Sequence, residues 1–223
     1  MDLIQAMQER HSARNYLDKQ IESDICEKLQ NLIDECNREF NLHIQLVTNE
    51  PQAFQSFLAH YGKFTNVKNY IVLIGKKSDD LDEKLGYCGG KLVLLAQSLG
   101  LNSCFVGLTY KKIKTAFTIK KDEKLRCVIA LGYASKVGLP HKQKDISRVS
   151  IAENPPEWFL NGVKAALLAP TSLNQQKFVF RLVDDNTVEA KAKTAFFSKI
   201  DLGIAKYHFE LGAGIENFKW LNN

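Results

Sequence analysis

The sequence predicts an α+β fold, because helical and strand patterns are mixed without the regular strand–helix–strand alternation of an α/β protein. Two nearly continuous apolar runs, at 69–75 and 125–134, have the length and composition of buried strands. Between them, residues 87–99 form a helical pattern that is apolar almost all round, which places this helix in the interior. With 223 residues, 45% of them hydrophobic, the chain is long enough to bury a sizeable core.

The elements before the first buried strand are short and amphipathic. Apolar residues recur at helical spacing in three segments and alternate with polar residues in a fourth. Ser23 is a candidate N-cap of the second helix, because its hydroxyl suits the free N–H groups at a helix start. The predicted elements are helices at 2–10, 21–38 and 51–60 and a strand at 42–48.

Gly100 ends the central helix, since glycine readily adopts the backbone conformation of a helix C-terminus. A loop is expected at 102–108 and a short helix at 110–117. The region 135–156, which contains glycine and three prolines, is predicted to be a connector. The remaining predicted elements are a helix at 157–168, a loop at 169–176, a strand at 177–183, a turn at 184–186 and a helix from about 202 to 221.

The composition argues against several classes of protein. Five cysteines without CxxC spacing and five histidines without paired ligand spacing disfavour a disulfide framework and a metal site. No apolar run approaches the ~20 residues of a membrane helix. The N-terminus has no signal or transit pattern, so we expect a cytoplasmic protein that does not bind membranes.

The net charge of +5 suits a small anionic ligand. Positively charged residues are most concentrated in the lysine-rich segment 111–126, which raises the alternative of a nucleic-acid-binding module. Acidic residues interrupt this segment and it lacks interleaved aromatic residues. A solvated surface is therefore favoured over nucleic-acid binding.

A faint internal repeat relates the two parts of the chain. Segments 29–50 and 163–186 share the order helix, polar loop, alternating strand and turn. Segments 85–100 and 201–214 share a glycine-containing entry into a helix. This pattern favours a single domain, residues 1–223, that contains two pseudo-symmetric halves. The halves span about 1–140 and 150–223.

Three short motifs suggest a binding site. In "RHSAR", residues 10–14, Arg10, Ser12 and Arg14 occupy alternate positions, which share one face of an extended segment. Two guanidinium groups and a hydroxyl on one face suit a phosphate or another flat anion. The other motifs are "GLNSCFVG" at 100–107 and "APTSLNQQ" at 169–176.

Together these motifs resemble the FMN-dependent nitroreductase family, which has an R-x-S-x-R element after its first helix and an A-P-S-S-x-N-x-Q-like loop before a strand. The sequence "HKQK" at 141–144 is similar to the basic pair that closes on the flavin phosphate in this family. The resemblance implies a nitroreductase-like sandwich, in which a mixed, mainly antiparallel sheet carries helices on both faces. The matching residues are Arg10, Ser12, Arg14, Pro170, Thr171, Ser172, Asn174 and Gln176.

The chain departs from the family pattern in two places. The A-P-S-S-like loop usually follows the first long helix, where this chain has "DECNREF" at 34–40. Lys177 and Phe178 stand where the family usually has Pro-Trp. The order of motifs indicates a rearranged branch in which two halves are fused into a pseudo-dimer. We therefore expect one FMN per chain and favour a monomer, with a homodimer as the alternative.

The resemblance also implies which residues contact FMN. Arg10, Lys142 and Lys144 would hold the phosphate, and Ser12 would donate its hydroxyl. Arg14 would lie toward the pyrimidine edge of the ring, where a cation stabilises the negative charge that develops on reduction. The expected cofactor-binding residues are Arg10, Ser12, Arg14, Cys104, Val106, Gly107, Lys142, Lys144, Pro170, Thr171, Ser172 and Asn174.

In the family, the backbone around Val106 and Gly107 faces flavin N5. Gly107 would allow this close approach, and Cys104 beside it is interpreted as a packing residue. No catalytic side chain is expected, since the cofactor carries the chemistry.

The function implied by the resemblance is that of an NAD(P)H oxidoreductase. Hydride would pass from NAD(P)H through flavin N5 to a small-molecule acceptor such as a nitroaromatic or a quinone. The alternative is a flavin-binding protein that stores, senses or delivers FMN without useful turnover. The altered "DECNREF" segment favours that alternative.

Overall fold

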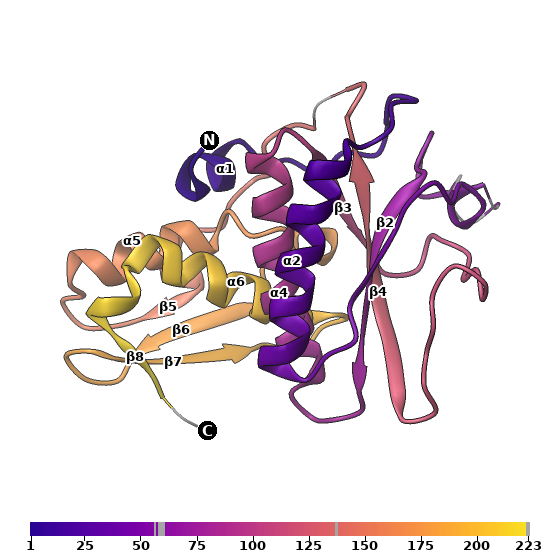
Figure 1. Ribbon diagram of the computed structural model, residues 1–223. Coiled ribbons are helices and arrows are strands. Elements are labelled where there is room, and N and C mark those ends of the chain that lie inside the picture. Colours follow the sequence, from indigo (N-terminus) through magenta and orange to yellow (C-terminus); the bar gives the residue numbers. More distant parts are fainter. Residues whose placement is uncertain (56, 58–60, 137, 222–223) are drawn as a thin grey trace. The chain divides into compact units, whose positions relative to one another are not determined.

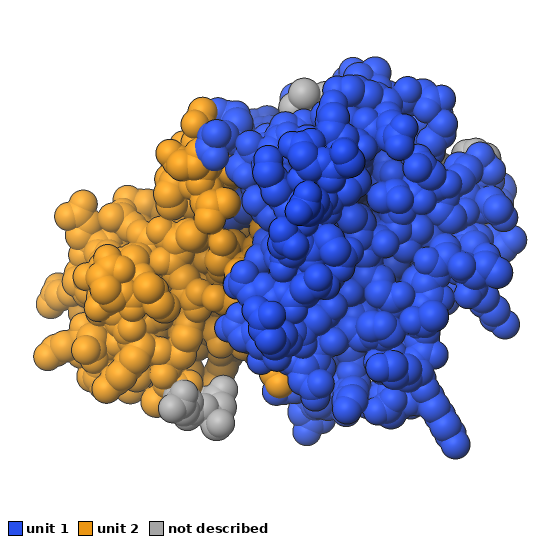
Figure 2. All heavy atoms as spheres, viewed as in Figure 1, with its two compact units in different colours: residues 1, 9–81, 92–140 blue, residues 2–8, 82–91, 141–223 orange. Residues whose placement is uncertain are grey.

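The structure, a computed structural model, describes residues 1–55, 57, 61–136 and 138–221. The chain divides into two units, coloured separately in Figure 2. The first unit contains residues 1, 9–81 and 92–140, and the second contains residues 2–8, 82–91 and 141–223. Each unit contains one four-stranded sheet with associated helices, so the predicted α+β class is confirmed (Figure 1).

The sheet of the first unit has the strand order β1-β2-β4-β3 and is antiparallel throughout. Its central strands, β2 and β4, form where the two apolar runs predicted buried strands. Seven of the eight residues of β2 are buried, which explains why this segment shows no polar alternation. The four strands are β1 (Gln45–Val47), β2 (Asn69–Lys76), β3 (Asn102–Val106) and β4 (Glu123–Gly132).

One face of this sheet packs against aromatic side chains from the surrounding loops. Tyr70, Val72 and Ile74 of β2 belong to one buried cluster with Phe54 and Phe64. The Phe54 ring lies 5.2 Å from that of Phe64 and 5.9 Å from that of Tyr70, both in edge-to-face arrangement. Among the described residues, side chains from irregular segments and a short 3₁₀ turn cover this face.

The other face of the sheet packs against helix α2 (Ser23–Phe40), which lies beside it in Figure 1. Ile71 and Leu73 alternate onto this face and are fully buried. Helix α2 buries Leu29, Ile33 and Cys36, which recur at helical spacing. The sheet is therefore covered on both sides.

Three predictions for the first unit are wrong. Residues 102–106 form strand β3 rather than a loop, because they pair residue by residue with the edge of β4. No helix forms at 110–117. There Lys111 N–H donates to the carbonyl oxygen of Ala53, and the irregular backbone buries Tyr110 and Phe117 in the aromatic face. Ser23 does not cap α2. It is the first helical residue, and Glu22 holds the cap position without a side-chain hydrogen bond.

The predicted helix at 51–60 is described only in part. Residues Gln52–Phe54 form a short 3₁₀ helix, η1. Residues 56 and 58–60 lie outside the described residues. Helix α4 (Leu81–Ser98) begins earlier than the sequence predicts and ends before Gly100, whose φ of +82° is the expected left-handed conformation.

The sheet of the second unit has the strand order β5-β6-β7-β8 and is mixed. Strands β6 and β7 form a hairpin around the predicted turn at 184–186, and the two outer pairs are parallel. The predicted terminal helix is too long. It ends at Ala213, because Gly214 leaves the helical conformation with φ +75°, and the chain continues into a strand. The strands are β5 (Ser150–Ile151), β6 (Phe178–Leu182), β7 (Thr187–Ala192) and β8 (Lys219–Trp220).

Helices α5 and α6 pack against each other and cover one face of this sheet. The rings of Phe180 in β6 and Phe209 in α6 stack with centroids 4.7 Å apart. The opposite face is polar, and Glu189 forms ion pairs there with Arg181 and Lys191. The remaining helical elements are α1 (Leu3–Glu9), α5 (Glu157–Ala166), α6 (Ser198–Ala213), η2 (Ile146–Arg148), η3 (Ser172–Asn174) and η4 (Ile215–Asn217).

Within the second unit, residues 82–91 of α4 contact α6 through two glycines. A Cβ at Gly86 would lie 2.1 Å from the Ile200 carbonyl oxygen, and a Cβ at Gly203 would lie 2.0 Å from that of Glu83. The contact is reciprocal, since Ile200 and Glu83 each precede a glycine by one helical turn. Backbone therefore touches backbone, and no larger residue fits at either position.

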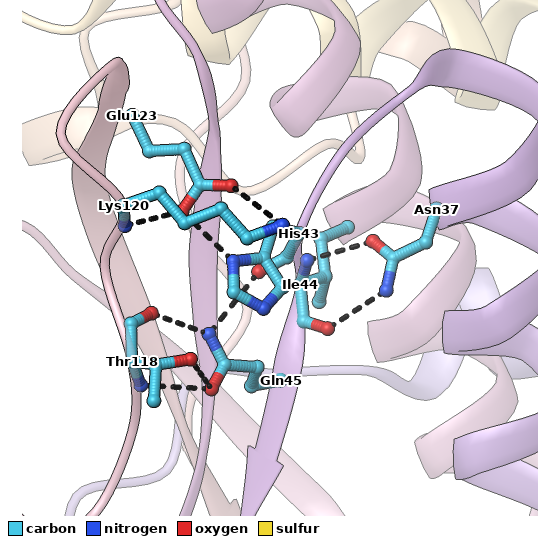
Figure 3. Close-up of polar contacts among 7 residues, drawn as sticks. All are labelled: Asn37, His43, Ile44, Gln45, Thr118, Lys120 and Glu123. Carbon is cyan, nitrogen blue, oxygen red and sulfur yellow. Dashed lines mark hydrogen bonds and ion pairs between the residues drawn. The ribbon is translucent and has the colours of Figure 1, made fainter.

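A polar cluster fixes the lysine-rich segment to the edge of the first sheet (Figure 3). His43 Nδ1 lies 2.8 Å from Glu123 Oε2, and the side chain of Gln45 bonds both backbone groups of Thr118. Burial acts to raise the pKa of Glu123, but hydrogen bonds from Lys120 N–H and His43 outweigh it, and this pKa is lowered overall. This cluster holds an irregular stretch of chain in place.

Candidate functional site

The R-x-S-x-R segment lies along strand β3 in the first unit. Ser12 forms a parallel bridge with Ser103, and Ala13 N–H donates to the Ser103 carbonyl oxygen at 3.1 Å. The hydroxyl of the buried Tyr16 donates to the carbonyl oxygen of Ala13 at 2.8 Å. The segment 10–14 is therefore extended, as the alternation of residues predicts, and is fixed by its neighbours.

Arg10 is the most unusual residue of this segment. Its side chain is only 3% exposed, and its Nε is buried without a hydrogen-bond partner in the part of the chain that the structure describes. Burial lowers the pKa of Arg10 to about 10, although Cys104 and Tyr16 oppose this shift. A buried guanidinium with an unpaired donor is costly, and an incoming anion would satisfy it.

Cys104 lies among the three polar residues of the segment. Burial raises the pKa of its thiol, while the charge of Arg14, a hydrogen bond with Ser12 and the charge of Arg10 oppose the shift. The thiol is thus protonated at neutral pH, in line with a packing role. Arg14, unlike Arg10, is exposed, and its guanidinium carbon lies 6.0 Å from the centroid of the Phe64 ring.

The loop at 169–176 belongs to the second unit and is organised around the buried Gln176. The Gln176 Oε1 accepts from Lys144 N–H at 2.8 Å, and its Nε2 donates to the Lys142 carbonyl oxygen at 2.8 Å. Its backbone N–H donates to Thr171 Oγ1 at 3.1 Å. Asn174 donates to the same Lys142 carbonyl at 2.8 Å. The loop and the basic pair are thus one hydrogen-bonded structure.

The two lysines differ in what their ammonium groups contact. Lys144 Nζ donates to the carbonyl oxygens of Gln175 at 2.5 Å and Gln176 at 3.0 Å, so it secures the loop. Burial, followed by the charge of nearby cations, lowers the pKa of Lys144. Lys142 is exposed. A contact of either lysine with a phosphate stays a prediction.

Asp201 is a residue of this group that the sequence does not reveal. Its Oδ1 accepts from Ser172 N–H at 3.0 Å, and its Oδ2 accepts from Gln175 Nε2 at 2.9 Å. Burial raises the pKa of Asp201 to about 6, partly offset by these two hydrogen bonds. An aspartate in the first turn of a helix is ordinary, so no local pattern distinguishes it.

The predicted site residues therefore form two groups, one in each unit. Val106 is buried at the end of β3 and Gly107 follows it directly, in the same unit as the R-x-S-x-R segment. The buried Pro170 belongs to the second group. That both groups contact one FMN stays a prediction. The first group is Arg10, Ser12, Arg14, Cys104, Val106 and Gly107, and the second is Lys142, Lys144, Pro170, Thr171, Ser172 and Asn174.

The described residues contain no group of three or more histidine, cysteine, aspartate or glutamate side chains arranged to hold a metal ion. Every helix among them is too short or too polar to cross a membrane.

Comparison with known proteins identifies similar sequences and structures. A family model described as "Putative TM nitroreductase" matches residues 2–213. No curated protein matches the sequence. A structure from Thermotoga maritima, described as a "putative nitroreductase", superposes with a TM-score of 0.70 at 19% identity, covering 100% of this chain and 89% of that one.

Two further structures resemble about two thirds of the chain. One, from Bacteroides thetaiotaomicron, is described as a "Putative NADH dehydrogenase/NAD(P)H nitroreductase". It has a TM-score of 0.54 and 19% identity, and covers 68% of this chain and 96% of that one. The other is an FMN-dependent nitroreductase from Clostridium difficile, with a TM-score of 0.51 and 19% identity, covering 66% and 94%. At these identities the likeness shows the fold.

Proposed function

The chain belongs to the nitroreductase family, whose family model matches residues 2–213. On this basis, we propose that it is an FMN-dependent oxidoreductase that uses NAD(P)H as its reductant. The names of two proteins with the same fold, an FMN-dependent nitroreductase and an NAD(P)H nitroreductase, support this assignment. When bound, FMN would accept a hydride from NAD(P)H and pass electrons to a small acceptor such as a nitroaromatic or a quinone.

The observation that carries the proposal is that the Arg10 side chain is buried with an unpaired donor. A guanidinium that is 3% exposed and has an unpartnered Nε fits an anionic ligand, and the FMN phosphate is such a ligand. Ser12 lies two residues after Arg10 in the same extended segment, beside Cys104. Arg10 would bind the phosphate and the Ser12 hydroxyl would donate to it.

Arg14, in contrast to Arg10, would act on the flavin ring. It is exposed and carries its charge above the Phe64 ring. Near a flavin ring, this fixed cation would stabilise the negative charge that develops during reduction. The buried Cys104 and Val106 would supply an apolar wall that limits access of water.

The first test of the proposal is an absorption spectrum of the purified protein. We expect a yellow protein, or one that becomes yellow when FMN is added. The flavin absorbance should bleach rapidly when NADH or NADPH is added without oxygen. A colourless protein that takes up neither FMN nor FAD would contradict the proposal. Flavin that binds but is not reduced would favour a storage, sensing or delivery protein instead.

We further propose that the chain binds one FMN and does so as a monomer. Each motif occurs once, and residues 34–40, where the family loop is usually found, lie inside helix α2. That segment therefore offers no second loop for a cofactor. Titration with FMN, combined with mass measurement in solution, should give one flavin per chain in a monomer. Two flavins per chain, or retention of flavin only by a dimer, would exclude this stoichiometry.

A further inference from the structure

Asp201 is a buried carboxylate whose hydrogen bonds are directed at one loop. It is 3% exposed, and its two oxygens accept from Ser172 N–H and from the Gln175 amide. The same Gln175 amide also donates to the Phe196 carbonyl oxygen at 2.7 Å. These bonds join residues 172–175 to the start of helix α6.

The loop that Asp201 contacts has a strained backbone. Leu173, Asn174 and Gln176 have φ values of 51°, 53° and 43°, in the left-handed region that residues with side chains rarely adopt. The Leu173 side chain is 97% exposed, so its packing does not compensate for this strain. The conformation is therefore held by hydrogen bonds from neighbouring residues.

The charge of Asp201 has no cation to balance it. Among the described residues it forms no ion pair, and the groups that face it are the neutral donors of Ser172 and Gln175. From α4, Glu83 contacts Gly203 but pairs with Lys206 at 2.7 Å. Lys199, on α6 itself, is exposed. An unpaired buried carboxylate lowers stability, so its presence calls for another explanation.

We propose that the Asp201 carboxylate is a positioning residue that holds the loop 171–176 in its strained conformation, and that protonation of this carboxylate loosens the loop. The geometry stands by itself, while the consequence for cofactor binding rests on the proposed function. If the loop contacts FMN as the family resemblance implies, the affinity for FMN falls when Asp201 loses its charge.

The pH dependence separates this role from a purely structural one. The pKa of Asp201 is raised from 3.8 to about 6 in the folded protein, so the folded state binds the proton more tightly than the unfolded state. The contribution of Asp201 to stability is therefore greatest below pH 4 and falls as the pH rises toward 6. The ionised carboxylate, however, makes the stronger hydrogen bonds to the loop. Global stability and order of the loop should change in opposite directions.

The decisive experiment compares the wild-type protein with Asp201→Asn, which removes the charge and, like protonation, turns one accepting oxygen into a donor. At pH 8 we expect the variant to have a melting temperature about 5 °C higher. We also expect amide hydrogen exchange at residues 172–176 that is about tenfold faster, and an FMN affinity about tenfold weaker. Relative to the intrinsic exchange rate at each pH, wild-type protein at pH 5 should show the low loop protection of the variant at pH 8.

Control variants isolate the effect of the buried charge. Asp184→Asn changes an exposed carboxylate that accepts from Asn186 and Thr187 N–H, and it should leave exchange in the loop unchanged. Gln175→Ala removes one donor but keeps the charge, so it should speed loop exchange and lower the melting temperature at pH 8. Asp201→Asn measured at both pH 8 and pH 5 shows how much of the change comes from groups other than Asp201.

The outcomes distinguish the two proposals. If the wild type binds no FMN but the protection of its loop, relative to the intrinsic exchange rate, depends on pH and on Asp201, the flavin proposal fails and the role of Asp201 stands. If Asp201→Asn binds FMN normally and loop exchange is unchanged, Asp201 is not a positioning residue. If Asp201→Asn has a lower melting temperature than the wild type at pH 8, the proposal that the charge lowers global stability while ordering the loop is overturned.

Discussion

The substitution Gly203→Ala is expected to lower the free energy of unfolding by about 2–4 kcal/mol. Its Cβ would lie 2.0 Å from the Glu83 carbonyl oxygen and 2.7 Å from the Tyr87 backbone nitrogen. Both atoms belong to the backbone of α4, which cannot rotate away as a side chain can. The helix segment would have to move, weakening the hydrogen bonds of Glu83 with Lys206 and of Tyr87 with Glu210.

Gly90, on the α4 side of the same helix contact, provides the matched control. A Cβ at Gly90 would meet Ile204 and Tyr207 at 3.5 Å, which is ordinary contact. Because alanine is the better helix former, Gly90→Ala should be neutral or stabilise the protein by up to about 1 kcal/mol. Urea denaturation followed by circular dichroism measures both variants. Equal stability of Gly203→Ala and Gly90→Ala would show that the two helices do not approach as closely as described.

The substitution Arg10→Ala should weaken FMN binding by one to two orders of magnitude. A charge-assisted hydrogen bond contributes roughly 1.5–3 kcal/mol, which corresponds to this range of affinity. Stability without FMN should not fall in proportion, because the variant also removes a buried charge with an unpaired donor. Fluorescence titration at fixed ionic strength measures the affinity, and thermal melting of the apoprotein checks the fold.

Two further arginines complete this experiment. Arg38, in the last turn of α2, is exposed, and Arg38→Ala should bind FMN like the wild type. Arg14→Ala should slow anaerobic reduction more than it weakens binding, since Arg14 is exposed beside Phe64 rather than buried like Arg10. If Arg10→Ala and Arg14→Ala bind FMN with unchanged affinity and are reduced at the normal rate, the assignment of the N-terminal motif is wrong.

The elements that were predictable from the sequence are those whose burial determines which residue types they contain. Residues 70–74 of β2 and 127–131 of β4 are buried on both faces, so these stretches are apolar without interruption. Strand β3 was not predictable, because it depends on pairing with the distant edge of β4. The final helix was predicted too long, since only the positive φ of Gly214 and the pairing of β8 with β7 show where it ends.

In the candidate site, too, some features follow from the sequence and others depend on packing between distant segments. The extended form of the R-x-S-x-R segment follows from its alternation, but the contrast between buried Arg10 and exposed Arg14 arises from packing along β3. The loop 169–176 is predicted by its proline and amide residues. Its anchor, Asp201, lies beyond the β6–β7 hairpin, where no short-range pattern relates it to Ser172.

The reciprocal glycine contact between α4 and α6 also sets the order in which the chain can fold. Lys206 and Glu83, which bond across this contact, are 123 residues apart in sequence. During synthesis, residues 82–91 leave the ribosome long before α6 exists, and the second unit also needs residues 2–8. Its assembly therefore closes long loops, which costs entropy before any contact compensates and slows folding. A chain that stops short of α6 would leave the glycine face of α4 exposed to solvent and to other nascent chains.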